Sequence, residues 1–367
     1  MKNLVFVVYD SICNSVFHGQ VIAPLIKKLK RGDFGRVYIV SFELHKPDKK
    51  IVDAIVDQHS ALSLIILKKN SFITPLFLFL EIKRLKKYLK FLEQASPEQA
   101  PPEPALFDNY ELIARGALAG YIAQRALDSE KCQSVTIQAR GLLAEEYAYT
   151  HQNGSFLKKH FYRWRETQYS KIEQSVYEKK RNNIYTIEVV SRALQEYLVE
   201  TFGADSASCT LASDDVPAKI DESYIVQWRD EIRKKLKIPS YFTVYCFSGA
   251  AKPWQCPHLV VDFFKKQYAQ NKNVFLLVLT QDVSFFQQAL SKFPNDNYHL
   301  SFVKHEDVYK HLASADIGLV FREPGIVSWI ARPVKAMEYE AAGLNIIHNS
   351  TVDWLVERHN ICNELHF

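Results

Sequence analysis

The residues best suited to chemistry lie near the carboxyl end of the chain, in the sequence ARPVKAMEYEAAG. Lys335 and Glu338 are three residues apart, so a helix would place both on one face. Pro333 suits the first turn of that helix, and Gly343 suits the left-handed residue just past its end. Free N–H groups at the start of a helix, together with a lysine, bind phosphate. A capped surface helix with a solvated Glu and Lys is the alternative for this motif alone.

A second cluster follows the apolar segment VYCF. Gly249 has no side chain, so a ligand can approach the backbone there, and Lys252 would balance phosphate charge. Trp254 follows in the same turn. Taken alone, Lys252 is better explained as a solvated loop lysine than as a ligand-binding residue. Its place directly after a predicted strand favours binding.

Short apolar segments alternate with longer amphipathic ones, the pattern of an α/β protein with parallel sheets. Predicted helices of the amino-terminal part lie near 20–30, 114–127 and 156–180. Its predicted strands are 4–9, 36–42, 62–67, 134–139 and 184–190. Predicted strands of the carboxy-terminal part are 243–247, 274–279, 298–303, 316–321 and 344–348.

The stretch 203–222 separates these parts; it is rich in Ser, Ala and Asp and lacks periodicity. We therefore expect a Rossmann-like domain at 1–205, a linker at 206–238 and a second Rossmann-like domain at 239–367. Ligands of parallel sheets bind at the carboxyl ends of the strands. The two domains are accordingly expected to face each other across a cleft that holds the substrates.

The segment ADIGLVFREPGIVSWIARPVKAMEYEAAGLNII resembles the donor-binding segment of family 4 glycosyltransferases, especially bacterial capsule and polysaccharide enzymes. The shared pattern is a strand with AD-x-G-L, a charged turn, P-x-K-x-x-E-Y-x-A-x-G and another strand. YCFSGAAKPWQC is similar to the turn that opens the second domain of that family. The resemblance implies a GT-B fold, in which two Rossmann-like domains face across a cleft. It also implies transfer of a sugar, with retention, from a nucleotide-diphosphate donor.

Donor binding is the role that the resemblance implies for one set of residues, with Glu338 accepting hydrogen bonds from ribose hydroxyls. The set is Gly249, Trp254, Pro333, Lys335 and Glu338.

The chain departs from the family at one catalytic position. Many members carry a further glutamate where this chain has Ile330, and Glu323 is the candidate substitute. No D-x-D metal motif follows a predicted strand, so protein cations must stabilise the leaving diphosphate. Lys252, Arg322 and Glu323 are the candidate catalytic residues, and no metal or other cofactor is expected.

Acceptor-side residues are expected in the first domain. TIQARGLLAEE resembles the capsule enzymes' D-x-R-G-x-x-x-E-E, with Gln138 in place of the aspartate, and retains Arg140 and Glu145. The loop DSICNSVFHGQ resembles the acceptor-side loop of the family, which makes His18 and Gly19 candidates. The alternative is a strand–loop–helix unit whose first-turn glutamates interact with the helix dipole.

The overall charge of +5, with a pI near 8.7, is too small for a nucleic-acid-binding protein. It suits phosphate-bearing small molecules or an anionic membrane surface. Six scattered cysteines without a C-x-x-C pair indicate reduced thiols and a cytoplasmic location. Cys246, Cys256 and His258 lack the second ligand pair of a zinc site. The amino terminus lacks the pattern of a signal peptide, and no apolar run reaches transmembrane length.

Residues 76–92 form a basic amphipathic segment that could contact anionic lipid. One helical face carries its aliphatic residues, and packing of that face on the sheet of the first domain is the alternative. These residues are Leu78, Ile82, Leu85, Leu89 and Leu92.

We therefore expect a hexosyltransferase that moves a sugar from a UDP- or GDP-linked donor to a glycan or lipid-linked acceptor. Ile330 and Gln138, where carboxylates are usual, favour a second hypothesis. It is a non-catalytic protein that binds a nucleotide sugar or acts as a membrane-surface adaptor.

Overall fold

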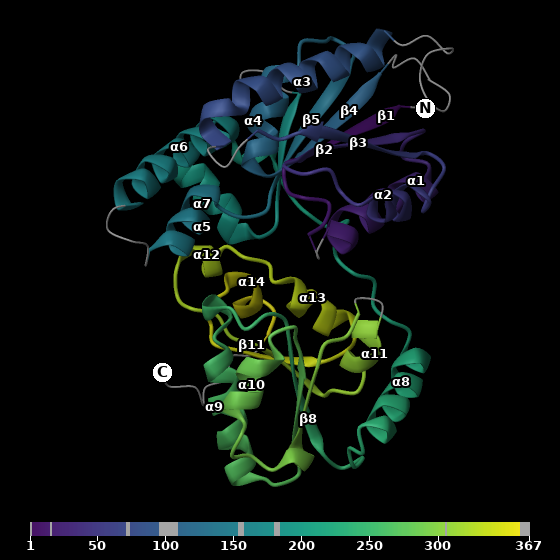
Figure 1. Cartoon of the computed structure of the whole chain (residues 1–367), viewed down its shortest axis with the longest axis vertical. Helices are drawn as coiled ribbons and strands as arrows, with labels where there is room; N and C mark the ends of the chain where they lie inside the picture. Colours follow the sequence, from purple (N-terminus) through teal and green to yellow (C-terminus); the bar gives the residue numbers. More distant parts are fainter. Residues whose placement is uncertain are drawn as a thin grey trace. The chain divides into compact units, whose positions relative to one another are not determined.

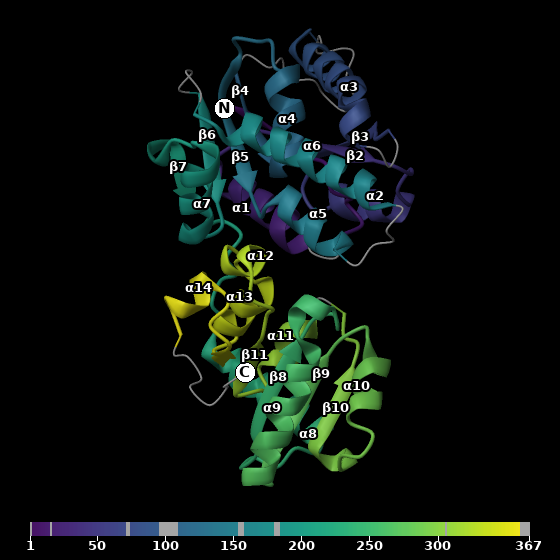
Figure 2. The same cartoon turned by 90° about the vertical axis from the view of Figure 1, so that its left-hand side faces the viewer.

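The computed structural model describes residues 2–14, 17–70, 74–94, 109–152, 158–179, 184–304 and 307–359. The chain divides into two compact units, Met1–Asp215 and Val216–Phe367, each built on a parallel sheet flanked by helices (Figures 1 and 2). The expected α/β class with two Rossmann-like sheets is confirmed.

Unit 1, Met1–Asp215, has the strand order β3-β2-β1-β4-β5-β6-β7. Helices α3, α4 and α6 cover one face of this sheet, and α1 and α2 the other (Figure 1). Strands β1 and β2 are buried along their whole length, as expected where helices cover both faces. The strands are β1 Asn3–Val8, β2 Val37–Glu43, β3 Leu62–Lys68, β4 Tyr110–Arg115, β5 Cys132–Ala139, β6 Tyr185–Val189 and β7 Cys209–Leu211. The helices are η1 His18–Ile22, α1 Ala23–Arg31, α2 Lys49–Val56, α3 Thr74–Gln94, α4 Gly116–Ala126, α5 Leu143–His151, α6 Lys159–Tyr177, α7 Arg192–Phe202 and η3 Ser206–Ser208.

Strand β4 is absent from our sequence prediction. The helix expected at 114–127 begins only at Gly116, because Ala114 and Arg115 complete β4. Glu111 and Arg115 interrupt the apolar pattern of YELIAR, and this concealed a central strand that pairs with β1 and β5. The other predicted strands of unit 1 are confirmed.

Unit 2, Val216–Phe367, has the strand order β10-β9-β8-β11-β12, and all five predicted strands are confirmed. The strand order reverses between β8 and β11, which is where ligands bind in such sheets. The strands are β8 Thr243–Ser248, β9 Val274–Leu279, β10 Tyr298–Ser301, β11 Ile317–Val320 and β12 Asn345–His348. The helices are α8 Glu222–Lys235, η4 Pro253–Gln255, α9 Pro257–Gln270, α10 Val283–Ala289, η5 Asn295–Asn297, α11 Val308–Leu312, α12 Ile326–Trp329, α13 Val334–Ala341 and α14 Asp353–Val356.

The range 206–238, expected as a linker, contains regular structure on both sides of the boundary between the units. Strand β7 pairs with β6, and Ala212 donates a backbone hydrogen bond to Val189. Helix α8 packs against α11. The crossing itself lies near Val216, which begins unit 2.

Asp316, the aspartate of the AD-x-G-L pattern, anchors α8 to the sheet of unit 2. Its carboxylate pairs with Arg229 at 2.5 Å and with Arg233 at 2.8 Å, and it accepts the Val244 N–H at 2.7 Å. Arg233 is buried. The aspartate therefore has a structural role.

Replacement of Asp316 by asparagine is expected to destabilise unit 2 by roughly 3 kcal/mol, because the buried Arg233 would lose its counter-charge. Urea unfolding measures the change. Asp296→Asn is a matched control, since this aspartate is exposed on η5. Equal stability of the two variants would contradict the anchoring role.

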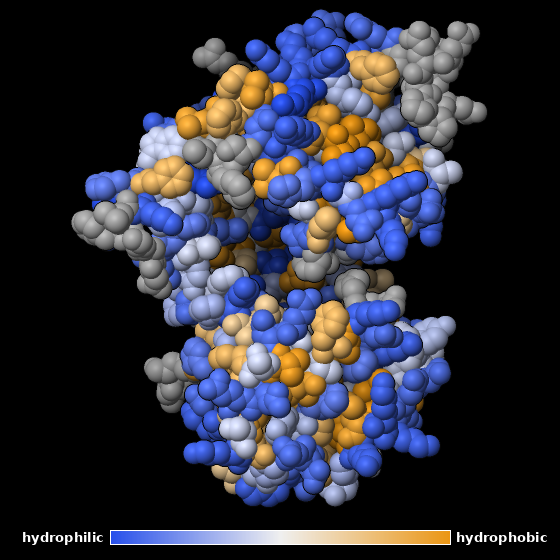
Figure 3. Space-filling model, viewed as in Figure 1, coloured by the Kyte–Doolittle hydropathy of each residue, from blue (hydrophilic) through white to orange (hydrophobic). Residues whose placement is uncertain are grey.

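Hydrophobic and hydrophilic residues are interspersed over the visible surface of both units (Figure 3). Within the described parts of the chain, no helix combines the length and the apolar character that crossing a membrane requires.

Candidate functional site

The loop after β8 and the helix α13 meet in unit 2. Gly249 has φ +132°, and a Cβ atom there would lie 2.9 Å from Gln255 Oε1 and 3.1 Å from Lys335 Nζ. The Lys335 ammonium donates to Gln255 Oε1 and lies 4.0 Å from the centre of the Phe247 ring. Asp282 fixes the same loop by accepting the Ala251 N–H at 2.7 Å. Two segments, joined by a contact between residues 80 positions apart in sequence, thus form one site, which a side chain at 249 would obstruct.

Lys335 and Glu338 have unusual acidities. Burial and the nearby Arg322 cation lower the pKa of Lys335 to about 7. Burial raises the pKa of Glu338 to about 7, although Lys335 opposes the shift. Both side chains are thus held where their charged forms are poorly solvated. An arriving anion or hydroxyl group would compensate for the lost hydration.

The turn after β11 lies beside the first loop. Glu323 donates its N–H to the Trp254 carbonyl at 3.3 Å. Burial raises the pKa of the Cys256 thiol to about 11, the Glu323 carboxylate adds to that rise, and Arg322 opposes it. The predicted residues Trp254, Arg322 and Glu323 therefore belong to the same neighbourhood. Asn349 holds the turn, since its side chain bonds both the N–H and the carbonyl of Arg322.

Lys252 and Ile330 occupy contrasting environments. Lys252 is exposed, and its carbonyl accepts the Gln255 N–H at the start of η4. Ile330, at the position of the missing glutamate, ends α12 and is buried. Position 330 therefore offers no carboxylate to the site. The candidate substitute, Glu323, lies seven residues earlier in the chain.

Helix α13 follows the pattern expected from its sequence, with one difference. Its first helical residue is Val334, so Pro333 is the N-cap rather than a member of the first turn. Gly343 has φ +77° and lies directly after the C-cap, as expected. Its N–H bonds the Glu340 carbonyl and that of Leu344 bonds the Tyr339 carbonyl, the pattern of a Schellman motif.

Tyr339 connects α13 to the sheet. Its ring is fully buried, and its hydroxyl accepts the Ser248 N–H at 2.8 Å, directly before Gly249. The ring packs on Gly318 of β11, where a Cβ atom would lie 2.1 Å from it. This contact explains the G of AD-x-G-L and the Y of E-Y, because only glycine leaves room for the ring that positions the helix.

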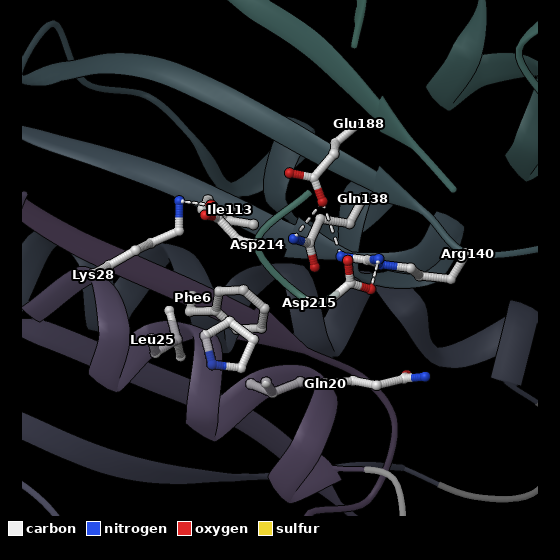
Figure 4. Close-up of a pocket in the computed structure, with 12 residues that line it drawn as sticks. Phe6, Gln20, Leu25, Lys28, Ile113, Gln138, Arg140, Glu188, Asp214 and Asp215 are labelled. Atoms are coloured by element: carbon white, nitrogen blue, oxygen red, sulfur yellow. Dashed lines mark hydrogen bonds and ion pairs between the residues drawn. The ribbon is translucent and has the colours of Figure 1, made fainter. Parts of the chain in front are cut away.

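In unit 1, Arg140 lies in a small pocket between α1 and the sheet (Figure 4). It pairs with Asp215 at 2.6 Å and with Glu188 at 2.9 Å, and Gln138 donates to Glu188 at 2.8 Å. Lys28 pairs with Asp214 at 2.5 Å on the opposite wall. The carboxylates around Arg140 therefore come from residues that our sequence analysis did not single out. Phe6, Gln20, Val21, Pro24, Leu25 and Ile113 complete the lining.

The remaining acceptor-side candidates do not line this pocket. His18 begins η1, is exposed and lies 3.2 Å from Gln58 Oε1, and Gly19 lies in the same turn. Glu145 is in the first turn of α5, as expected. The carboxylate that accepts the first N–H groups of α5 is Glu173, at 2.6 and 3.1 Å. Burial raises the pKa of Glu173 to about 7.

No local sequence pattern indicates the roles of Glu173, Glu188 and Asp215. Each acts on a residue 29 to 75 positions away in the chain, so only the fold brings the partners together. Among the described residues, no group of three or more His, Cys, Asp or Glu side chains is placed to hold a metal ion.

Solved structures share this architecture over almost the whole chain. A glycosyltransferase from Rickettsia africae is 13% identical, with a TM-score of 0.60 over 98% of this chain and 82% of its own. WaaG, a glycosyltransferase involved in lipopolysaccharide biosynthesis, is 14% identical, with a TM-score of 0.61 over 98% and 85%. HepE from Anabaena, in complex with UDP-glucose, is 11% identical, with a TM-score of 0.60 over 97% and 83%. No family model and no curated protein sequence matches this chain. The likeness confirms the GT-B fold.

Proposed function

We propose that the protein is a glycosyltransferase that uses a nucleotide-diphosphate sugar as donor. The observation that carries this proposal is the contact of Lys335 with the Gly249–Gln255 loop, at the carboxyl end of β8. A phosphate at the start of α13 would meet helix N–H groups and the Lys335 ammonium together. Glu338, on the same helix face, is suited to accept hydrogen bonds from ribose hydroxyls.

The reaction we propose is a retaining, metal-independent transfer of a hexose. Lys252, Arg322 and Lys335 would stabilise the charge that develops on the leaving diphosphate. Glu323, in the turn after β11, is the carboxylate proposed to assist the reaction. The solved relative with UDP-glucose favours UDP over GDP as the nucleotide. A glycan or lipid-linked acceptor, met in the cytoplasm and bound with the help of Arg140, Glu145, His18 and Gly19, completes the proposal.

A thermal-shift screen of nucleotide diphosphates and their sugars tests donor binding. A ligand at about a hundred times its Kd stabilises the folded protein by about 2.7 kcal/mol, so UDP or GDP should raise the Tm by several degrees. Transfer then needs assays with UDP- and GDP-sugars and a panel of acceptors, with and without EDTA. Absence of any shift, together with no sugar release, would overturn the proposal. Binding without turnover on any acceptor would favour the non-catalytic hypothesis, which the buried Ile330 supports.

Donor affinity is expected to peak near pH 7. Lys335, with its pKa lowered to about 7, loses its positive charge as the pH rises through neutrality. Glu338, with its pKa raised to about 7, loses its negative charge as the pH falls through neutrality. Because binding uses the ammonium and the carboxylate, affinity should fall by up to about tenfold per pH unit on each side. Calorimetric titration with UDP measures this profile.

Two variants test separately the fall in affinity above pH 7 and the fall below it. Lys335→Met should remove the fall at high pH, and Glu338→Gln the fall at low pH. A wild-type profile retained in both variants would contradict the assignment of these groups.

A further inference from the structure

Helix α3 has two different faces. The aliphatic face that our sequence analysis considered for lipid contact is largely buried in unit 1, so its packing alternative is correct: Leu78, Leu85, Leu89 and Leu92 belong to the core. The opposite face exposes large apolar side chains: Leu76 is 54% exposed, Phe79 52% and Phe91 46%. A lipid contact of this helix must therefore use this second face.

Lysines share the exposed face of α3. Lys83, Lys87 and Lys90 are exposed and follow Leu76 and Phe79 at spacings of three or four residues, which keeps all of them on one side of the helix. The Lys83 ammonium lies 5.9 Å from the centre of the Phe79 ring. In the view of Figure 3, hydrophobic and hydrophilic residues alternate where Figure 1 draws α3.

The acidic residues of α3 do not offset this positive charge. Glu81 is fully buried, where it accepts hydrogen bonds from the Tyr9 hydroxyl at 3.0 Å and the Asn70 N–H at 2.8 Å. Glu93 accepts from the Tyr110 hydroxyl at 3.0 Å. The exposed side of α3 therefore presents lysines and apolar side chains together, without an acidic group of its own.

The start of α6 also combines exposed basic residues with exposed apolar side chains. Phe161 is 40% exposed and stacks on Trp164, with ring centres 5.8 Å apart. Three exposed basic residues lie close to the pair in sequence: Lys158, Lys159 and Arg163. Helices α3 and α6 contact each other on the same face of the sheet. Each runs antiparallel to the strands, so both begin at the carboxyl edge of the sheet, where substrates bind in such folds.

We propose that these residues form a docking surface for a membrane with anionic lipids. Lysine is depleted from the buried centres of protein interfaces, so alternating Lys and Phe side chains fit a protein partner poorly. At a bilayer surface, the rings enter the headgroup region while the lysines reach the lipid phosphates. The inference deepens the proposed function, since it places a lipid-linked acceptor beside unit 1.

Vesicle flotation of the full chain tests this surface. The protein should float with phosphatidylcholine vesicles that contain phosphatidylglycerol, and should remain unbound with phosphatidylcholine alone or at high salt. Each Lys→Gln change at 83, 87 or 90 should weaken partitioning about fivefold, so the triple variant should lose roughly a hundredfold. Leu76→Ser with Phe79→Ser should also prevent flotation.

Matched controls come from exposed residues of unit 2. Lys265, Lys266 and Lys292 are exposed lysines, and Tyr241 is a 70% exposed aromatic residue. Their replacement by Gln and Ser respectively should leave flotation unchanged. The proposal is overturned if wild type does not float, if the control triple variant loses as much binding, or if the face only mediates self-association in sedimentation.

The same variants keep this proposal separate from the proposed function. UDP binding should be unchanged in the α3 variants, because no residue of the donor site is altered. Flotation without nucleotide binding would support the docking surface and contradict the transferase proposal. Nucleotide binding without flotation would support donor binding and contradict the docking surface.

Discussion

Replacing Lys335 by methionine is expected to lower kcat/KM for sugar transfer by about a hundredfold to a thousandfold, the usual effect of removing one group that stabilises developing charge. The loss should appear mainly in kcat if the ammonium acts on the leaving diphosphate in the transition state. Steady-state kinetics with the donor identified by the thermal-shift screen measures both parameters.

The fold should tolerate this change. Lys335 has its pKa lowered to about 7 by burial, and its neighbour is the Phe247 ring, which a methionine thioether contacts favourably. The Tm should therefore stay close to that of the wild type. Lys265→Met, at an exposed position of α9, is the matched control and should retain full activity. A wild-type value of kcat/KM in Lys335→Met would show that Lys335 does not take part in catalysis.

Replacing Gly318 by alanine is expected to destabilise unit 2 strongly. The added Cβ would lie 2.1 Å from the buried Tyr339 ring, so the ring or the backbone of β11 must move. Overpacking of this kind costs about 3 kcal/mol, which corresponds to roughly 10 °C in Tm for a unit of this size. Because Tyr339 also bonds the Ser248 N–H, donor binding should weaken in whatever fraction remains folded.

Gly32→Ala provides the comparison for this effect. Gly32 has φ +76° and nothing within 4 Å of an added Cβ, so alanine there meets conformational strain alone, at about 1 kcal/mol. Gly318, in contrast, meets only a steric conflict. Thermal unfolding measures the loss of stability in each variant. A loss in Gly318→Ala that is no larger than the loss in Gly32→Ala would contradict the packing role of Gly318.

Much of the fold was predictable because burial leaves a simple periodic signal. All five strands of unit 2 are apolar runs bounded by polar turns, and the sequence shows each one. Strand β4 was missed since Glu111 and Arg115 lie within it, and β7 since it has three residues. Neither strand contains the continuous apolar stretch by which a buried strand is recognised in a sequence.

The residues of the candidate site also differ in how far they could be predicted. Residues on one short motif, such as Pro333, Lys335 and Glu338, were found because helical spacing is visible in sequence. Partners supplied by distant segments were not found: Gln255 for Lys335, and Asp215 for Arg140. Their contacts depend on the strand order of each sheet, which no local pattern encodes. The roles of the site residues in transfer stay predictions.

The anchoring of Asp215 by Arg140 limits the reach of the chain between the two units. Asp215 is tied to unit 1 by that ion pair, and the Ile220 N–H is bonded to the Ala341 carbonyl at the end of α13, at 2.9 Å. Only Val216 to Lys219 separate these two attachment points. A fully extended chain covers about 3.6 Å per residue, so the tether spans at most about 18 Å. While both attachments hold, the two units are therefore joined by a tether of this limited length.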